Sequence, residues 1–366
     1  MPDLSSFILK RAPSWAVSLP EELQTPCLVI REQGIVENLH ATAEACNGVE
    51  RLMPHVKTHR AGWIVKLLMT EGVKAFKGAT VAEVAMVLAA GAEKVVWAYP
   101  TVNKAHIRSL LTLARSYPSS YIGGLIDSAA GASVWREIMA GSCPQNLKLI
   151  VDLDPGMGRT GTPLTLDALA LARDLHTLGC FGGWHVYDGH VQDRERAARH
   201  ERLADIVRRV AALMHAATNE GLSADLIAGA SYSFDAWPSG LANYVAPGSW
   251  VFSSSQHDAD LPELGWTPSA YVLATVISKK EATVTLDAGA KAISPDKPLA
   301  ERFRWDGRIL MMSEEHVVVE SSDLNVGDRV LLMPRHACTT AYLYDKAMVL
   351  GREGLWEFRE QLGSSR

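Results

Sequence analysis

Residues 147–189, LKLIVDLDPGMGRTGTPLTLDALALARDLHTLGCFGGWHVYDG, contain one strand–helix–strand unit whose pattern decides the fold. The apolar, β-branched run LKLIVDLD (147–154) predicts a strand, and FGGWHVYDG (181–189) predicts the next one. Between them, LDALALARDLHTLG (166–179) has the apolar spacing of a helix. Strands that alternate with helices lie parallel in one sheet, so this unit predicts an α/β protein.

The same alternation runs through most of the chain, from Thr25 to about Ser255. The predicted strands are 25–31, 51–57, 73–79, 94–100, 120–127, 147–154, 181–189 and 224–231. Eight such units over about 230 residues are typical of a closed (β/α)8 barrel of the TIM type. We therefore predict a barrel over residues 25–255, with an open, doubly wound parallel sheet as the alternative.

The pattern changes after Gln256. Residues 271–289, 308–320 and 328–338 alternate apolar and polar side chains with short turn-like breaks between them. This period of two is typical of half-buried strands in antiparallel pairs. We predict a smaller, mostly antiparallel β domain over residues 256–366, which residues 1–24 join because the barrel pattern starts only at Thr25.

Composition narrows the class of protein. The formal net charge of -5 argues against nucleic acid or an anionic membrane as the main partner. Apolar runs stay short of the roughly 18 residues that a membrane span needs, and the first residues resemble neither a signal peptide nor an anchor. The 5 cysteines are odd in number and scattered, which is not a disulfide framework. We expect a cytoplasmic enzyme.

A lysine marks the predicted barrel mouth, where the carboxyl ends of the strands carry the chemistry. Lys57 ends the second predicted strand, and as alternate residues of an extended segment His55, Lys57 and His59 would share one side. A lysine crowded by other cations loses its proton more easily and attacks carbonyls. Sugar-type aldolases and pyridoxal phosphate (PLP) enzymes use this chemistry. The alternative interpretation is a solvated loop lysine, and Lys77 is a rival at the third predicted strand.

Loops after the seventh and eighth predicted strands fit an anion. The stretches VYDGH (186–190), AGASYS (228–233) and PGSW (247–250) are rich in small and hydroxyl residues. Their backbone N–H groups can approach a phosphate closely, and the hydroxyls of Ser231, Ser233 and Ser249 can donate to it. Barrels commonly bind phosphate in these loops.

Arg159 follows a Gly-Met-Gly turn after the sixth predicted strand. We predict that this turn points Arg159 back over the barrel mouth, and a salt bridge at a helix N-terminus is the alternative. In a PLP enzyme, an arginine facing the pyridine nitrogen keeps that nitrogen unprotonated and makes the cofactor a weaker electron sink.

A family resemblance rests on five stretches. They are MPHVKTHR (53–60), DLDPGMGRTG (152–161), YDGH (187–190), DAGAKAISPD (287–296) and MPRHACTTAYLYD (333–345). In content and order they resemble the D-serine dehydratase and D-threonine aldolase group, which are fold-type III PLP enzymes distantly similar to alanine racemase. The resemblance covers about Thr25 to Val349.

The resemblance implies a role for each matched residue. Lys57 would form the Schiff base with PLP, and the catalytic residues would be Lys57, His59, Arg159 and Tyr187. His55 would also bind the cofactor, with Arg159 at the pyridine side and Tyr187 next to it. Phosphate would be bound by Ser231, Tyr232, Ser233, Gly248 and Ser249. Two positions depart from the family pattern, because Met53 replaces its usual arginine and Arg60 replaces its usual lysine.

His336 and Cys338 form the second candidate site. Two residues apart in a strand-like context, they would lie on one face. A core cysteine next to a polar histidine is the alternative, but in the family pattern this pair holds a divalent metal. Imidazole with thiolate suits zinc best, and manganese and magnesium are the alternatives.

The resemblance implies a PLP- and metal-dependent lyase on β-hydroxy-D-amino acids. In the family, histidine with cysteine is typical of dehydratases and histidine with aspartate of aldolases. Cys338 therefore favours a D-serine or D-threo-3-hydroxyaspartate dehydratase, with D-threonine aldolase-type cleavage as the alternative. An amino-acid racemase and a non-catalytic PLP carrier are further alternatives. A homodimer with shared active sites is also implied.

Overall fold

The computed structural model describes residues 9–10, 13–140 and 143–366, and these divide into two compact units. The barrel unit comprises the described residues of His40–Lys57 and Ala61–Gly248. The sheet unit comprises the described residues up to Leu39, together with Thr58–Arg60 and Ser249–Ser365. The chain passes between the units within α1 (Glu32–Ala45), on either side of Thr58–Arg60, and after Gly248.

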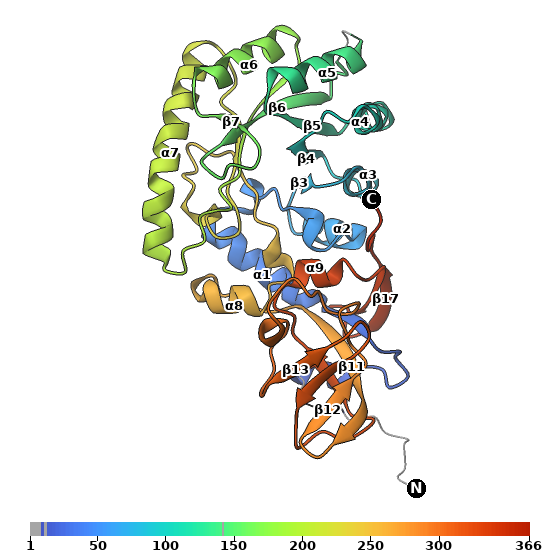
Figure 1. Ribbon diagram of the computed structural model, residues 1–366. Coiled ribbons are helices and arrows are strands. Elements are labelled where there is room, and N and C mark those ends of the chain that lie inside the picture. Colours follow the sequence, from blue (N-terminus) through green and yellow to red (C-terminus); the bar gives the residue numbers. More distant parts are fainter. Residues whose placement is uncertain (1–8, 11–12, 141–142) are drawn as a thin grey trace. The chain divides into compact units, whose positions relative to one another are not determined.

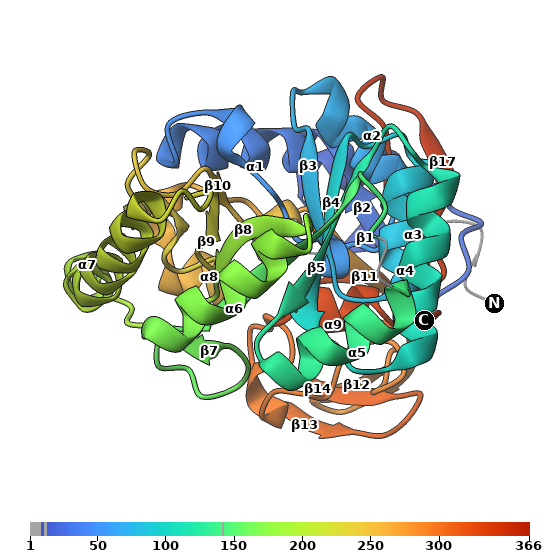
Figure 2. The same ribbon diagram turned by 90° about the horizontal axis from the view of Figure 1, so that it is seen from above.

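A curled sheet of parallel strands forms the barrel unit (Figures 1 and 2). Its strand order is β10-β9-β8-β6-β5-β4-β3, with β7 paired to β6. In chain order the strands are β3 (Ala75–Gly78), β4 (Lys94–Pro100), β5 (Tyr121–Ile126), β6 (Leu147–Asp154), β7 (Thr162–Pro163), β8 (Phe181–Val186), β9 (Leu226–Ala228) and β10 (Tyr244–Val245). The predicted α/β class is confirmed.

Residues 52–55 connect the two edge strands of this sheet. Leu52 forms a parallel bridge with Val245 of β10, and His55 forms one with Lys77 of β3. The Met53 amide donates to the Val245 carbonyl at 2.9 Å, and the Lys77 amide donates to the Pro54 carbonyl at 3.0 Å. Pro54 has no N–H to give to a ladder, so the segment is bridged rather than a regular strand. The sheet is nevertheless continuous around the barrel.

Our prediction of a barrel strand at 25–31 is wrong. β2 (Cys27–Arg31) pairs antiparallel with β11 (Ala270–Lys280) and parallel with β16 (Lys346–Leu350), all in the sheet unit. The run CLVIR is almost wholly buried, and such a run fits the interior of any sheet, so its composition could not identify its partners. The barrel is completed instead by β10, which has only 2 residues and gave no strand pattern.

Helices cover the outside of the barrel sheet (Figure 2). They are α2 (Gly62–Thr70), α3 (Val81–Ala89), α4 (Lys104–Ser116), α5 (Ala129–Met139), α6 (Leu166–Thr177) and α7 (Arg196–Asn219). Local chemistry starts several of them: Thr80, Asn103 and Ser128 each accept a backbone N–H of the first turn with the side chain. None of the described helices is both long and apolar enough to cross a membrane.

The barrel interior has an apolar layer with buried polar residues above it. The apolar residues are Met53, Ala75, Val96, Leu125, Ile150, Ile227 and Ala246. Lys77 and Asp152 stand two residues beyond Ala75 and Ile150, which places them on the same strand faces but nearer the carboxyl ends. Both are buried, as is His185 of β8. The candidate site is therefore built on a filled barrel rather than on a pore.

A mixed, mostly antiparallel sheet forms the sheet unit, in the order β13-β14-β12-β11-β2-β16-β17, with β15 paired to β1 and β11. The remaining elements are β1 (Leu9–Lys10), β12 (Thr283–Leu286), β13 (Ile309–Met312), β14 (Val317–Glu320), β15 (Arg329–Leu332), β17 (Trp356–Glu360), α8 (Ser255–Asp260) and α9 (Ala337–Ala341). The predicted presence of a smaller, mostly antiparallel β domain is confirmed, whereas the predicted bounds of the domains stay a prediction. Of residues 1–24, positions 1–8 and 11–12 lie outside the described residues.

Candidate active site

Lys57 lies at the carboxyl end of the barrel sheet, two residues after the bridge between His55 and Lys77. Its side chain is exposed, whereas His55 is buried and accepts the Lys57 amide on Nδ1 at 3.3 Å. Our prediction of a regular strand here is wrong, because Val56–Thr58 is a single 3-10 turn. Strand alternation therefore does not place His55, Lys57 and His59, although the predicted position of Lys57 at the barrel mouth is observed.

His59 belongs to the sheet unit and packs inside it. This side chain is buried, and its ring lies edge-on to that of Phe252 at 6.5 Å between centroids. Its catalytic role stays a prediction. In the barrel unit Met53, the first departure from the family pattern, is fully buried in the apolar layer, where a cation would need a buried partner.

Arg60, the second departure, anchors the end of the chain. Its guanidinium donates to the carbonyls of Gly363 and Ser365 and lies 5.1 Å from the centroid of the Tyr342 ring. A planar guanidinium can donate to two carbonyls along its edge while its face stacks on a ring, and the compact ammonium of lysine has no such face. The structure thus gives Arg60 a role in the sheet unit that explains why arginine suits this position.

The loop after β6 is shaped by Asp154. Its carboxylate accepts the backbone N–H groups of Gly156, Met157 and Gly158 at 2.9, 2.7 and 3.1 Å. Gly156 and Gly158 have φ of 116° and 68°, which glycine adopts without strain. Arg159 follows directly, at the position where the loop turns back toward the next strand.

Arg159 and Tyr187 come together over the carboxyl ends of β6 and β8. The guanidinium lies 4.6 Å from the centroid of the Tyr187 ring, a cation–π contact. Gly189 makes room for this ring, because a Cβ at Gly189 would lie 2.5 Å from its atoms. The predicted turn of Arg159 over the mouth is observed, whereas the assignment of both residues to a cofactor stays a prediction.

A buried polar chain runs beneath these residues across three strands. Lys77 Nζ on β3 lies 2.7 Å from His185 Nε2 on β8. His185 Nδ1 lies 2.6 Å from Asp152 Oδ1 on β6, and the Thr160 hydroxyl donates to Asp152 Oδ2 at 2.9 Å. Lys77, His185 and Asp152 are 2%, 2% and 3% exposed, so their charges are almost entirely removed from water.

Burial sets the protonation of this chain. It lowers the pKa of Lys77 to about 7, assisted by the positive charges of Lys57 and Arg159 and opposed by Asp152 and Asp188. Burial also lowers the pKa of His185, as does the charge of Lys77, and the hydrogen bond that His185 donates to Asp152 opposes this. A neutral His185 donates its Nδ1–H to Asp152 and accepts at Nε2, which agrees with both distances.

The predicted phosphate loops are fixed by a buried carboxylate. Asp188 accepts the Ser233 hydroxyl at 2.7 Å and the Trp237 indole N–H at 2.8 Å, which oppose the rise in its pKa that burial causes. The Ser233 hydroxyl is therefore used within the loop, which sequence reasoning did not foresee. Ser231 and Tyr232 lie in the same loop, and anion binding by these three residues stays a prediction.

Gly248 lies against the turn that carries Lys57. A Cβ at Gly248 would lie 2.7 Å from the His55 carbonyl oxygen and 2.9 Å from the His55 Cβ, so a larger residue would displace one of the two segments. Two of the predicted cofactor residues are thus in close contact within the barrel unit. Ser249, the next residue, belongs to the sheet unit and starts a 3-10 turn.

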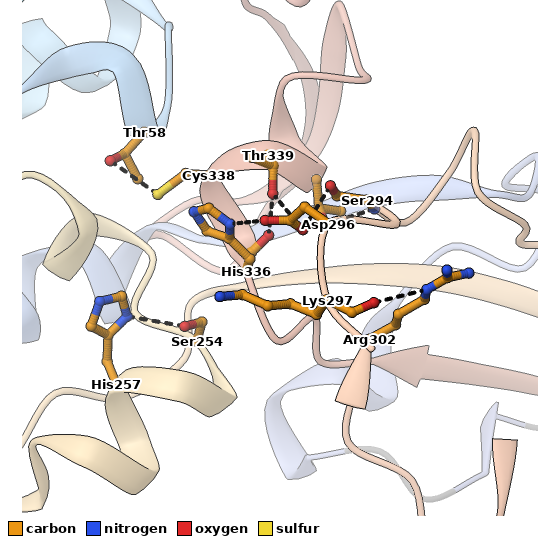
Figure 3. Close-up of polar contacts among 11 residues, drawn as sticks. Thr58, Ser254, His257, Ser294, Asp296, Lys297, Arg302, His336, Cys338 and Thr339 are labelled. Carbon is orange, nitrogen blue, oxygen red and sulfur yellow. Dashed lines mark hydrogen bonds and ion pairs between the residues drawn. The ribbon is translucent and has the colours of Figure 1, made fainter. Parts of the chain in front are cut away.

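The sheet unit brings His336, Asp296 and Cys338 into one cluster (Figure 3). His336 Nδ1 lies 2.5 Å from Asp296 Oδ2, and Asp296 Oδ1 accepts the hydroxyls of Ser294 and Thr339 at 2.9 and 3.3 Å. Our expectation of a strand is wrong here, because His336 is the N-cap of α9 and Cys338 lies in its first turn. The two side chains still interact, and Cys338 also donates to the Thr58 hydroxyl at 3.3 Å.

This cluster contains two side-chain types that can ligate a metal, an imidazole and a thiol. A carboxylate on Nδ1 fixes the imidazole so that Nε2 can face a metal, an arrangement common around metal-bound histidines. Burial lowers the pKa of His336, but its contacts with Cys338 and Asp296 outweigh burial and raise it to about 9. Within the described part of the chain, no three His, Cys, Asp or Glu side chains are placed so that together they could hold one metal ion. His336 and Cys338 would therefore leave positions open to water or substrate.

Family models divide the chain along the same lines. The model described as "Alanine racemase, N-terminal domain" matches residues 30–256, which is more than half of the 366 residues. The chain belongs to this family. The model described as "Putative serine dehydratase domain" matches residues 269–350 of the same family member, including His336 and Cys338. The resemblance expected from the sequence is thereby confirmed. No curated protein sequence matches the chain significantly.

Solved structures share the fold of this alanine racemase family member. D-threonine aldolase from Filomicrobium marinum has a TM-score of 0.84 at 24% identity, covering 94% of this chain and 96% of that one. D-threo-3-hydroxyaspartate dehydratase from Delftia sp. HT23 has 0.81 at 20%, covering 93% and 98%. Alanine racemase from Clostridium difficile 630 has 0.74 at 13%, covering 93% and 100%. At these identities the likeness establishes the fold alone.

Sequence reasoning missed three residues of the two clusters. Asp152 and His185 each place an ionisable side chain inside an apolar run, LKLIVDLD and FGGWHV, and this interruption was the available signal. Asp296 ends the quoted stretch DAGAKAISPD but received no role. The sequence indicated Lys77 only as a rival of Lys57, although burial lowers the pKa of Lys77 to about 7.

Lys77 makes the stability of the barrel unit depend on pH. Its ordinary pKa of 10.5 falls to about 7 on folding, so the unfolded chain binds more protons between these values. The stability that Lys77 contributes is therefore fully present above about pH 10.5 and is lost as the pH falls through 7, with a slope of about 1.4 kcal/mol per pH unit. Relative to wild type, Lys77→Met should lose about 2 kcal/mol of unfolding free energy from pH 7.5 to 9.

Urea unfolding followed by tryptophan fluorescence measures this difference. The matched control is Lys66→Met on the exposed side of α2, which should keep the wild-type dependence on pH. An identical pH dependence in Lys77→Met and wild type would show that the Lys77 amine stays charged in the folded chain.

Proposed function

We propose that the chain is a PLP-dependent lyase that acts on β-hydroxy-D-amino acids. The observation that carries this proposal is the combination of two features in one chain. One is Lys57 at the carboxyl end of an alanine racemase-type barrel, and the other is His336 with Cys338 inside the segment that matches a serine dehydratase domain. A lysine for the amino group and a metal pair for the hydroxyl are what this substrate class requires.

The barrel residues fit PLP. Lys57 offers an exposed amine, and the small residues Gly248, Ser231 and Ser233, with Tyr232 between the two serines, lie at the predicted phosphate end. Arg159, held over Tyr187, would face the pyridine ring. When bound, PLP supplies an electron sink for breaking bonds at the substrate Cα. The chain's own part is to supply the Lys57 amine and to hold the ring between fixed groups.

The sheet-unit residues fit a divalent metal. His336 and Cys338 would hold it, and Asp296 orients His336 through Nδ1. Imidazole and thiolate favour zinc over manganese or magnesium. Such an ion supplies Lewis-acid stabilisation to an oxygen of the substrate.

Dehydration is the reaction we favour, on D-serine or D-threo-3-hydroxyaspartate. It is supported by Cys338, because histidine with cysteine is the dehydratase pattern of the family that the sequence resembles. Retro-aldol cleavage of the D-threonine aldolase type is the second candidate. A racemase or a PLP carrier would leave the ordered contact between Asp296 and His336 without a function.

Lys57→Ala should abolish covalent attachment of PLP and turnover. The reason is that Lys57 is an exposed amine beside the predicted phosphate loops, whereas Lys77 is buried. Absorbance in the visible region, before and after borohydride reduction, measures covalent cofactor, and peptide mass spectrometry locates it. Lys66→Ala on α2 is the control. Covalent PLP that persists in Lys57→Ala would remove Lys57 from the site.

Product analysis on a panel of β-hydroxy-D-amino acids tests the reaction. Dehydration gives ammonia and a 2-oxo acid, whereas retro-aldol cleavage gives glycine and an aldehyde. We expect ammonia and a 2-oxo acid from D-serine or D-threo-3-hydroxyaspartate, and weaker turnover of the L-isomers. Racemisation without cleavage, or no turnover of any member of the panel, would contradict the proposal.

Metal removal should stop turnover and leave covalent PLP in place, because the two groups are held by different residues. Cys338→Ala and His336→Ala should each lower zinc affinity at least about tenfold, and Asp296→Asn should lower it about 10- to 100-fold. Chelator competition and elemental analysis measure the affinity. Cys27→Ala and Cys180→Ala are controls, which should cost about 1–2 kcal/mol of stability and leave zinc affinity unchanged. Full turnover in excess chelator would refute metal dependence.

A further inference from the structure

The buried chain of Lys77, His185 and Asp152 is not required for the roles proposed for Lys57, His336 and Cys338. It follows the arrangement that activates a nucleophile or a base, in which the active group contacts a histidine and the histidine contacts an orienting carboxylate. Here the distances are 2.7 Å from Lys77 to His185 and 2.6 Å from His185 to Asp152. Such a chain is costly inside an apolar barrel, which indicates a use beyond packing.

The hydrogen bonds of Lys77, His185 and Asp152 allow the chain to gain or lose one proton. Asp152 is the terminal acceptor, since it takes the Nδ1–H of His185 and the hydroxyl of Thr160. His185 is then a fixed acceptor at Nε2, toward which Lys77 directs one N–H. Two adjacent buried cations would repel each other, so Lys77 and His185 do not carry a positive charge together. The Lys77 amine is the member of the chain that gains or loses the proton.

Lys77 is surrounded by ionisable groups from each neighbouring element. His185 and Asp152 face it from β8 and β6, Lys57 from the turn after residue 55, Arg159 from the loop after β6, and Asp188 from the loop after β8. The Tyr187 ring centroid is 6.0 Å from Nζ. With a pKa of about 7, this amine is present in both protonation states near neutral pH.

The fold places Lys57 near the Lys77 amine. His55, two residues before Lys57, is bridged to Lys77, so the two lysines lie at the same end of neighbouring segments of the barrel. After burial, the positive charge of Lys57 lowers the pKa of Lys77 the most. A lysine that attacks a carbonyl must first lose a proton, and a neutral amine nearby is a suitable acceptor.

We propose that Lys77 is the proton acceptor for Lys57, with His185 and Asp152 as the residues that position it. An N–H bond of the Lys57 ammonium breaks and its electron pair stays on Lys57 Nζ. The lone pair of Lys77 Nζ forms the new N–H bond, directly or through one water, and the proton returns when Lys57 is released. The inference rests on the proposed function, because Lys57 needs a free lone pair only if it bonds to a carbonyl.

The rate at which apoprotein captures PLP covalently tests this step without measuring turnover. Samples are reduced with borohydride at set times between pH 6.5 and 9.5, and the modified Lys57 peptide is quantified by mass spectrometry. Lys77→Met should react at least about tenfold more slowly than wild type at pH 7.5. The deficit should disappear toward pH 9.5, where hydroxide can accept the proton in place of Lys77. Lys77→Arg, which keeps a charge but accepts no proton, should behave like Lys77→Met.

Two further variants complete the design. His185→Gln retains an acceptor but loses the oriented imidazole, so its rate profile should shift to higher pH less than that of Lys77→Met, and it carries the test if Lys77→Met does not fold. Lys94→Met is the control, because Lys94 starts β4 at the opposite end of the strands and stacks on Tyr121 and Tyr244 at 4.4 and 4.6 Å. It should follow the wild-type profile.

Each outcome has one meaning. Lys77→Met with the wild-type profile, or with a deficit that persists unchanged at pH 9.5, overturns the proton-acceptor role, the second case indicating a structural effect. If wild-type protein captures PLP at Lys57 but Lys77→Met is unaffected, only this inference fails. If wild-type protein captures no PLP at Lys57, both the proposed function and this inference are refuted.

Discussion

Closure of the barrel sheet by residues 52–55 is the constraint on which the site depends. Two backbone hydrogen bonds, from Met53 to Val245 and from Lys77 to Pro54, connect the segment to both edge strands. Because Pro54 lacks an N–H and Val56–Thr58 is a 3-10 turn, the segment leaves the sheet immediately after His55. Lys57 is thereby placed at the carboxyl end of the barrel with its side chain exposed. A regular strand through this region would have carried the lysine along the sheet face instead.

The same closure brings the lysine turn to the other parts of the barrel mouth. Gly248, just beyond β10, packs on the backbone of His55 at a distance that admits no Cβ. His55 is bridged to Lys77, which reaches across the barrel to His185 and Asp152. The turn that carries Lys57 therefore contacts both the predicted phosphate end and the buried polar chain. A shift of the turn would disturb both at once, which is why a bridged and proline-containing segment is suited to hold it.

Hydrogen bonds to carboxylates organise each cluster. Asp154 shapes the loop that ends in Arg159, Asp188 holds the loop of Ser233, and Asp152 orients His185. In the sheet unit, Asp296 does the same for His336. Each of these carboxylates fixes a loop or a side chain of its own cluster. These four aspartates therefore act as supports for the residues around them.

Local patterns in the sequence were sufficient to predict the classes of structure and chemistry. Alternation of apolar runs with helical spacing predicted the parallel barrel, and period two after Gln256 predicted the antiparallel sheet, because each follows from the geometry of the local backbone. The position of Lys57 after a closing segment and of Arg159 after a glycine turn also followed from local signals.

The pairing of the strands and the contacts of the buried polar residues could be known only from the folded chain. The buried run at 27–31 is compatible with either sheet, and it joins β11 because strand pairing is a long-range contact that composition does not encode. The two residues of β10 were too few to show a period, yet they complete the barrel. Lys77, His185 and Asp152 lie on three strands separated by many residues, so their contact depends on the register of the closed sheet. The altered protonation of Lys77 exists only once that closure removes it from water.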